Sequence, residues 1–335
     1  MKRIVLFFFL TGLFYLTIMW LLPEPHKVEK IVLKINRFEK ELFSINSNNV
    51  ANKSKQWDRD FGSFNEVFSR QILQISETNN DMEYYNALLA FTYNRNMREA
   101  YDSTKILFSD FSILRHELEL AFSKFSTAFP DYPIPEITTF FGGFNYGVVT
   151  YDDNIGIGLE NFLGKNSKFY KYLGDPLYLR FQKQKKFISS NVMEVWFNEH
   201  FQRYLVGRDF LAQMIQKGKM MFFLDQFLSE LDIHEKFRFS KEEMSWVQEN
   251  ESSIWQYFVQ EDLLFSNKDS DFRSYINYAP FAKGMPKEAP ARVAYFIGYR
   301  IVSAYMTNNS IDVESLMYLT DANEFLKKSK YKPNK

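Results

Sequence analysis

Four histidines are the residues of this chain that could first suggest metal chemistry, and their spacing argues against it. A zinc peptidase presents two histidines four residues apart on one helix, so that both imidazoles reach the same ion. Here the shortest separation is 34 residues, between His200 and His234, and His26 and His116 lie farther away. HELEL at 116 and HEKFR at 234 begin like that motif but have no second histidine. With no cysteine in the 335 residues either, we expect no metal and no cofactor.

Two other stretches share only part of a known motif. GIGLEN, from Gly156, begins like a dinucleotide-binding loop, but Asn161 stands at the third glycine position and the sequence around it predicts no βαβ unit. NKDSDFRS, from Asn267, spaces two aspartates like calcium ligands but has neither the loop glycine nor the closing glutamate. The sequence also has no G-x-S-x-G nucleophile motif and no phosphate-binding loop. We therefore expect that the protein is not an enzyme.

The segment MIQKGKMMFFLDQFL, which begins at residue 214, has a mostly apolar helical pattern with charged positions inside it. On helical spacing Gly218 and Asp225 share one face, where a glycine allows the backbone of another element to approach closely. Lys217 and Lys219 point to other faces. We expect their stems to lie along apolar surface while their charges stay in water.

Two arginines lie eight positions apart in PARVAYFIGYRIVSAYM and so share a helix face approximately. Gly298 lies between Arg292 and Arg300. Because buried arginines usually pair with carboxylates, we predict that one of the two is the partner that a buried Asp225 would need. Two interpretations stay open, a structural ion-pair network and a site for a ligand or partner protein.

A further polar set lies in WVQENESSIWQYFVQEDLLFS, where Glu251 and Trp255 are four positions apart. We predict that these sets together form a degenerate cleft or partner site. Its candidate residues are Lys217, Gly218, Lys219, Asp225, Glu251, Trp255, Arg292, Gly298, Tyr299 and Arg300.

The elements that must position these residues are mostly helical. A helical period runs from Trp57 to about Thr127 and returns after Gly164 as far as the C-terminus. Between these regions, residues 136–164 are rich in β-branched and aromatic residues and predict one extended segment followed by a hairpin, with its turn at residues 152–154. The sequence therefore predicts an α+β fold, predominantly α-helical, with a small antiparallel sheet near 136–164 flanked by helices.

The N-terminus carries an apolar run. Met1, Lys2 and Arg3 precede an uncharged stretch of nineteen residues, Ile4 to Leu22, which at about 1.5 Å per residue is long enough to cross a bilayer core. We expect an uncleaved signal anchor over residues 1–22, and a cleaved signal peptide is the alternative.

The region after the predicted anchor is polar. We expect residues 23–56 to be an extended segment and linker, in which Val28 to Asn36 alternate like a strand and residues 44–55 form a turn-rich linker. Residues 57–333 are expected to form a single, mostly helical domain.

The charge balance of the chain is even, with 41 Lys and Arg against 41 Asp and Glu. A neutral chain without a basic stripe has no bias toward nucleic acid, so we expect no nucleic-acid partner. Aromatic residues make up 18% of the chain, which predicts a core filled with rings.

Five blocks in order carry a family resemblance. Together the chain resembles GldB, the gliding-motility lipoprotein of Bacteroidota, over about residues 28 to 333. The blocks are IPEITTFFGGFNYGVVTYDDNIGIGLENFLGKNSKFY, MIQKGKMMFFLD, WVQENESSIWQYFVQEDLLFS, PFAKGMPKEAPARVAYFIGYRIVSAYM and LKKSKYKP. The resemblance implies a cell-envelope protein needed for gliding, with partners in the gliding or type IX secretion machinery.

The GldB family is in turn distantly similar to zinc-dependent peptidases of zincin-like fold. In those enzymes an H-E-x-x-H helix precedes a helix that begins E-G, whose glutamate can bind the metal. Here FNEHFQRYL around His200 lacks the motif, and Lys217 stands where the glutamate would be. Since an ammonium group repels a divalent cation, the resemblance implies a degenerate zincin-like architecture without its metal site.

GldB proteins typically carry a lipobox cysteine, and this sequence has no cysteine. We therefore expect the apolar N-terminal run to attach the protein to a membrane, with the domain facing the periplasm. Three functions follow as alternatives: a non-enzymatic envelope protein acting through protein contacts, a metallopeptidase with an unusual ligand set, and a small-ligand or peptide binder using the region of Arg292 and Arg300.

Overall fold

The structure, a computed structural model, describes residues 29–75, 81–204 and 207–333. The expected signal anchor over residues 1–22 lies outside these ranges. None of the helices within them has both the length and the hydropathy that a membrane span requires.

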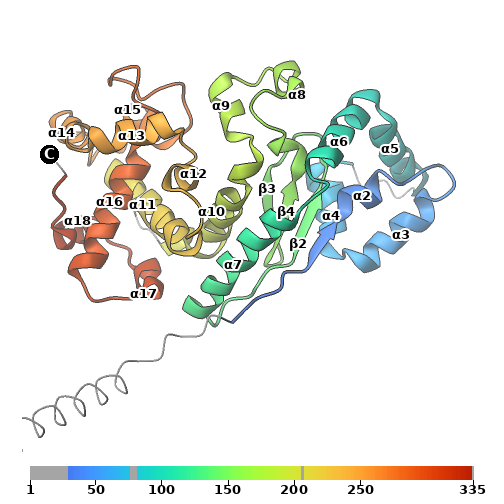
Figure 1. The fold of residues 1–335 in the computed structure, drawn as a ribbon, viewed down its shortest axis with the longest axis horizontal. Helices are drawn as coiled ribbons and strands as arrows, with labels where there is room; N and C mark the ends of the chain where they lie inside the picture. The colour runs from blue at the N-terminus through green and yellow to red at the C-terminus, as the bar shows by residue number, and fades with distance from the viewer. Residues whose placement is uncertain (1–28, 76–80, 205–206, 334–335) are drawn as a thin grey trace, which may run out of the picture.

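Helices dominate the described chain, and a small sheet lies among them (Figure 1). The N-terminal elements are β1 (Ile35–Arg37), α2 (Phe38–Leu42), α3 (Val50–Asp60), α4 (Ser63–Val67), the π-helical turn η1 (Phe68–Ile72), α5 (Asp81–Tyr93), α6 (Arg95–Leu107) and α7 (Ser112–Ala128). The central elements are β2 (Ile137–Phe140), β3 (Val148–Tyr151), β4 (Asn154–Gly158), η2 (Leu159–Phe162), α8 (Lys168–Tyr172), α9 (Leu177–Gln182) and η3 (Lys185–Phe187). The remaining elements are α10 (Ile188–Phe201), η4 (Gln202–Tyr204), α11 (Phe210–Phe227), α12 (Ile233–Phe237), α13 (Lys241–Glu249), α14 (Glu251–Gln260), α15 (Asp269–Ile276), α16 (Val293–Asn308), α17 (Val313–Tyr318) and α18 (Ala322–Ser329).

The sheet has four strands in the order β1-β2-β4-β3. The predicted hairpin is confirmed: β3 and β4 are antiparallel, and Asp152 and Asp153 between them have positive φ angles of 43° and 58°. The prediction of an antiparallel sheet is wrong for the other two pairings, because β1 runs parallel to β2 and β2 runs parallel to β4. The long helical crossover from α2 to α7 brings the chain back to start β2 in the same direction as β1.

Both faces of the sheet are buried. Ile137, Ile155 and Ile157 pack into the larger hydrophobic core, with the helices of the C-terminal half. On the opposite face, Phe140 packs into a second core made by the N-terminal helices. A Cβ at Gly156 would lie 3.1 Å from the Phe140 ring, so the glycine leaves room for that ring.

The expected linker region is a folded part of the second core. Residues 50–55, which the turn-rich pattern assigns to a linker, begin α3, and Phe38 before them starts α2. The rings of Trp57, Phe64 and Phe68 pack around Phe38 with centroids 4.8–5.3 Å away. The linker prediction is therefore wrong, because the contact between Trp57 and Phe38 comes from tertiary packing that local turn composition does not report.

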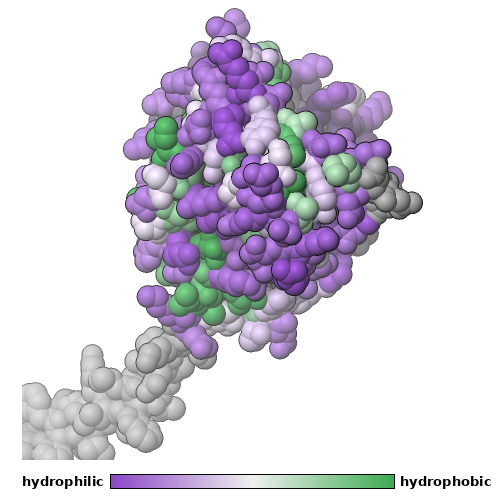
Figure 2. All heavy atoms as spheres, turned by 90° about the vertical axis from the view of Figure 1, so that its right-hand side faces the viewer, coloured by the Kyte–Doolittle hydropathy of each residue, from purple (hydrophilic) through white to green (hydrophobic). Residues whose placement is uncertain are grey.

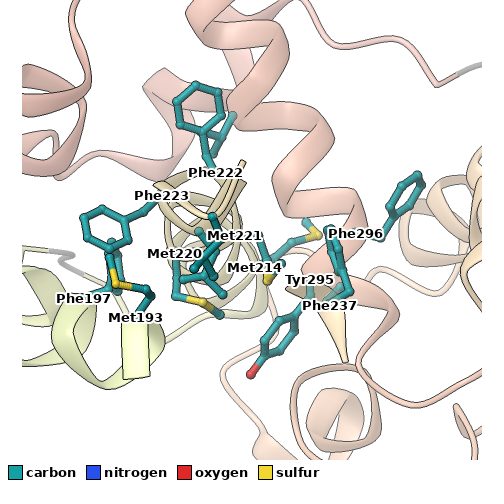
Figure 3. Packing of buried hydrophobic residues seen from close by; sticks show 14 of the residues in the cluster. Met193, Phe197, Met214, Met220, Met221, Phe222, Phe223, Phe237, Tyr295 and Phe296 are labelled. Atoms are coloured by element: carbon teal, nitrogen blue, oxygen red, sulfur yellow. The ribbon is translucent and has the colours of Figure 1, made fainter. Parts of the chain in front are cut away.

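The helix α11 crosses the larger core and is buried around most of its circumference. Figure 3 shows its methionine and phenylalanine side chains between α10, which contributes Met193 and Phe197, and α16, which contributes Tyr295 and Phe296. The predicted aromatic core is confirmed by these contacts. By contrast, the face that carries α3 and α5 is mostly hydrophilic, with small separate apolar groups (Figure 2).

Candidate functional site

Several of the candidate residues lie on α11 and α16, which cross in close contact. A Cβ built on Gly218 would lie 2.3 Å from the carbonyl carbon of Gly298, and one built on Gly298 would lie 2.1 Å from the oxygen of Met214. Real side chains do not tolerate such distances, so the two backbones touch only because both positions are glycine. The predicted close approach at Gly218 is confirmed, and it fixes how residues on either side of the crossing face one another.

Lys219 is completely buried, which corrects the expectation that its charge lies in water. Its Nζ donates to the carbonyl oxygens of Met317 at 2.7 Å and Leu319 at 3.0 Å, at the C-terminal end of α17. Burial lowers the pKa of Lys219 to about 7. The expectation was wrong because α11 is covered by other helices on the side where Lys219 points.

Lys217 is half-buried, and its Nζ lies 5.4 Å from the centre of the Tyr295 ring. Its ammonium group lies against an aromatic face.

Asp225 has partners other than the predicted arginines. Lys236 of α12 forms an ion pair with it at 2.7 Å, and the hydroxyl of Tyr299 donates to it at 2.9 Å. Burial, followed by the charge of Asp225, raises the pKa of Tyr299 to about 12. The pairing with Arg292 or Arg300 is therefore wrong. Lys236, which lies in a short helix that the sequence did not single out, takes the place of the predicted arginine.

Arg300 pairs instead with Glu251, the first residue of α14. Its Nε donates to Glu251 at 3.0 Å, and the hydroxyl of Tyr331 donates to the same carboxylate oxygen at 2.8 Å. Glu251 is 2% exposed, whereas the Arg300 side chain is 35% exposed, so the arginine connects a buried carboxylate to the surface. Trp255 supports this arrangement with an edge-to-face contact to the Tyr331 ring at 5.4 Å.

Three of the candidate residues line one surface groove of about 350 Å³. They are Glu251, Tyr299 and Arg300. Because Tyr299 donates a hydrogen bond to Asp225, the Asp225–Tyr299 pair lies next to the groove. We call this surface the Glu251 groove, and its lining residues are Ile233, Met244, Gln248, Glu251, Phe296, Tyr299 and Arg300. The groove therefore combines apolar walls with a partly exposed arginine and a tyrosine.

Arg292 does not join this groove. It does not share a helix face with Arg300, because it precedes α16 as its N-cap in the left-handed conformation, with φ at 67°. Its guanidinium carbon lies 4.1 Å from the Tyr295 ring centre and 4.4 Å from that of Tyr278, and its Nη1 donates to the Phe237 oxygen at 3.2 Å. It is 2% exposed.

The sequence reasoning missed two ionisable residues, Arg238, which is buried, and Glu194, whose side chain is 15% exposed. They form an ion pair, and Arg238 also donates to Asn191 at 2.8 Å. Burial alone would raise the pKa of Glu194, but Arg238, Lys217 and Arg292 outweigh it and lower that pKa. A lone carboxylate within the apolar run NVMEVWF was the available signal for Glu194.

His200 packs against aromatic side chains. It lies 4.2 Å from the Trp196 ring centre and 5.1 Å from that of Tyr132, and burial lowers its pKa. Across the ranges that the structure describes, no three His, Asp or Glu side chains gather closely enough to hold a metal ion.

Neither a curated protein nor a solved structure matches this chain. The zincin-like architecture therefore stays an expectation from the resemblance. The family model described as "Gliding motility protein GldB" matches residues 23–333. That match covers the sheet, the α11–α16 crossing and the Glu251 groove, and it confirms the predicted family. The chain belongs to the GldB family of gliding motility proteins.

Proposed function

We propose that the protein serves gliding motility as a non-enzymatic component of the cell envelope that works by binding another protein at the Glu251 groove. The role in gliding follows from the family. The contact mechanism is our proposal, and its partners are expected among the proteins of the gliding or type IX secretion machinery. Membrane attachment by the N-terminal run, with the domain facing the periplasm, belongs to the same proposal.

The observation that carries the contact mechanism is the composition of the Glu251 groove. Tyrosine and arginine are the residues most often found at the energetic centres of protein interfaces, and Tyr299 and Arg300 lie side by side here among apolar walls. Their carboxylate partners, Asp225 and Glu251, hold both side chains in place before any partner arrives. This preorganisation lowers the entropy that binding would cost.

A complementation assay tests the proposal. A strain that lacks the gene is expected to lose colony spreading, and the wild-type chain is expected to restore it. Gln248 is an exposed lining residue of the groove, so Gln248→Trp is expected to fill the groove without disturbing the core and to reduce spreading. Glu249→Trp is the matched control, because Glu249 is the exposed neighbour on the same helix and does not line the groove.

Site-specific crosslinking in the native host identifies the partner. A photoreactive residue at Gln248 is expected to form an adduct with a gliding or secretion protein, whereas one at Tyr93, exposed on α5, is expected to form none. A deletion strain that spreads normally would refute the gliding role. Equal spreading of the two tryptophan variants at equal protein levels would refute the groove as the contact site.

The absence of catalysis is part of the same proposal and has its own measurement. Elemental analysis of the purified chain is expected to find no zinc, and peptide substrates are expected to remain uncleaved. Bound zinc together with cleavage would instead favour a metallopeptidase with an unusual ligand set.

A further inference from the structure

Positive charge is in excess at the N-terminal end of α16, in a place that shares no lining residue with the Glu251 groove. Arg238 and Arg292 are buried, and Lys217 and Arg292 both lie against the ring of Tyr295. The described carboxylate that these three cations act on is Glu194, which is ion-paired with Arg238. We call Glu194, Lys217, Arg238 and Arg292 the Arg292 cluster. With three cations and one carboxylate the cluster has an excess of positive charge, which a second anion would reduce.

The unpaired side of Arg292 has the geometry that recognises a carboxylate. Its Nη1 donates to the backbone of Phe237, but Nε and Nη2 have no hydrogen-bond acceptor among the described residues. Those two nitrogens form the side-on fork that binds both oxygens of a carboxylate in parallel. The rings of Tyr278 and Tyr295 lie against the guanidinium group and keep the fork in one orientation. A buried charged donor without an acceptor is unfavourable, so the site favours an anion.

Arg292 lines a cavity of about 60 Å³. Its Nε and Nη2 are themselves enclosed, so a ligand in the cavity reaches them when the lining side chains shift. One water takes about 30 Å³ in the liquid, so the cavity has the size of a carboxylate group and little more. Gln182 lines the same cavity, and its Nε2 donates to the Arg238 oxygen at 3.3 Å while its Oε1 has no donor among the described residues. Glu243 also lines it, but the carboxylate of Glu243 accepts the N–H of Ser240 at 2.7 Å in the capping box of α13.

The remaining walls are largely rings and small apolar residues, including Phe181 and Phe239. A ligand that satisfies every unpaired group therefore needs a carboxylate, an adjacent N–H donor and an apolar body. The C-terminal end of a peptide has all three, because its last amide N–H lies next to its carboxylate.

We propose that the cavity beside Arg292 binds the C-terminal carboxylate of a short peptide. The two carboxylate oxygens accept from Nε and Nη2 of Arg292, and the last amide N–H of the peptide donates to Oε1 of Gln182. The carboxylate reduces the excess positive charge of the Arg292 cluster. This site does not rest on docking at the Glu251 groove.

Calorimetric titration of the full-length chain in mild detergent tests the proposal. The probes are N-acetyl-alanyl-alanine, its C-terminal amide, and acetate. The free acid is expected to bind, and the amide is expected to bind at least about tenfold more weakly because it loses the charge-assisted pair. Acetate is expected to bind more weakly than the dipeptide because it has no N–H for Gln182.

Two variants and a control test whether the ligand binds at Arg292 and Gln182. Arg292→Lys keeps the charge but loses the fork, so it is expected to weaken dipeptide binding about tenfold. Gln182→Met is expected to weaken the dipeptide and leave acetate unchanged. Arg273→Lys is the control, because the Arg273 side chain is 63% exposed in a surface ion pair.

Thermal melting shows whether each variant is folded. Three outcomes would each overturn the proposal. They are equal binding of the dipeptide and its amide, no binding of the dipeptide at millimolar concentration, and unchanged dipeptide binding by a folded Arg292→Lys variant. If the melting temperature of Arg292→Lys shows that this variant is not folded, two other measurements test the proposal. They are the binding of the free acid against the amide by the wild type, and the titration of Gln182→Met. The spreading assay with Gln248→Trp is independent of all three results.

Discussion

Three buried cations of this protein have three different kinds of partner. Lys236 has a carboxylate partner in Asp225. Lys219 has two backbone carbonyls and, at 6.0 Å, the ring of Phe325. Arg292 has one carbonyl and three aromatic rings. A carboxylate stabilises the charged form, whereas carbonyl oxygens offset the desolvation of Lys219 only in part and leave the pKa of Lys219 lowered to about 7.

At the residue scale, Lys219→Met is expected to remove a pH dependence of stability. The pKa of Lys219 is lowered to about 7 in the folded protein from 10.5, so between these values the unfolded chain binds more protons. The free energy of unfolding of the wild type therefore rises with pH across this window, by up to about 1.4 kcal/mol per pH unit from this residue.

Denaturant titrations between about pH 7.5 and 9.5 measure this effect as the difference between wild type and variant. Lys241→Met, at an exposed position of α13, is the control and is expected to run parallel to the wild type. A Lys219→Met profile that also runs parallel to the wild type would show that Lys219 stays charged in the fold.

At the scale of elements, the crossing of α11 and α16 depends on two glycines, one from each helix. Gly218 and Gly298 bring the backbones into contact, and side chains three and four residues away then interdigitate along both helices. The crossing sets the position of Tyr299 relative to Asp225, so the geometry at the edge of the Glu251 groove depends on it.

Gly218→Ala is expected to destabilise the protein by about 3 kcal/mol or more, because its Cβ would overlap the Gly298 backbone and force the helices apart. Urea denaturation measures the loss. Gly147→Ala is the matched control, since a Cβ there meets its neighbours at 3.5 Å or more, and it is expected to change stability little. Similar losses in both variants would contradict the special role of the crossing.

The sheet shows where element prediction succeeds and where it stops. The hairpin was predictable because alternating apolar residues flank an aspartate-rich turn, a signal contained within the segment 148–158. The parallel pairings were not, since β1 and β2 are separated by the whole of α2 to α7, and strand direction depends on how that crossover packs.

At the scale of the whole molecule, one sheet joins two hydrophobic cores. Ile137 and Phe140 belong to the same strand but face different cores, so β2 contributes to both. Loss of packing in the core of the N-terminal helices therefore reaches the larger core through the sheet.

Phe38→Ala is expected to cost about 3–5 kcal/mol and to leave a single unfolding transition. Phe38 is completely buried among aromatic rings, so its removal leaves a cavity in the core of the N-terminal helices. Hydrogen exchange is expected to speed up in α5 and α6 and also in α11. Phe265→Ala, at a side chain 63% exposed, is the control. Exchange that changes in α5 and α6 alone would show that the two cores unfold separately.

The sequence by itself determined the family, the helical majority, the β3–β4 hairpin, the aromatic core and the glycine at the helix crossing. Each of these features follows from a local sequence pattern or from the order of motifs along the chain. Tertiary structure alone decided the partners of Asp225, the burial of Lys219, the separation of Arg292 from Arg300 and the folding of residues 50–55 into α3. For the charged residues the physical reason is that a charge is satisfied by whichever oxygen or ring the packing brings near. Met317 and Tyr331 lie 98 and 80 residues away in sequence from the groups that they satisfy, so no local pattern contains these pairings.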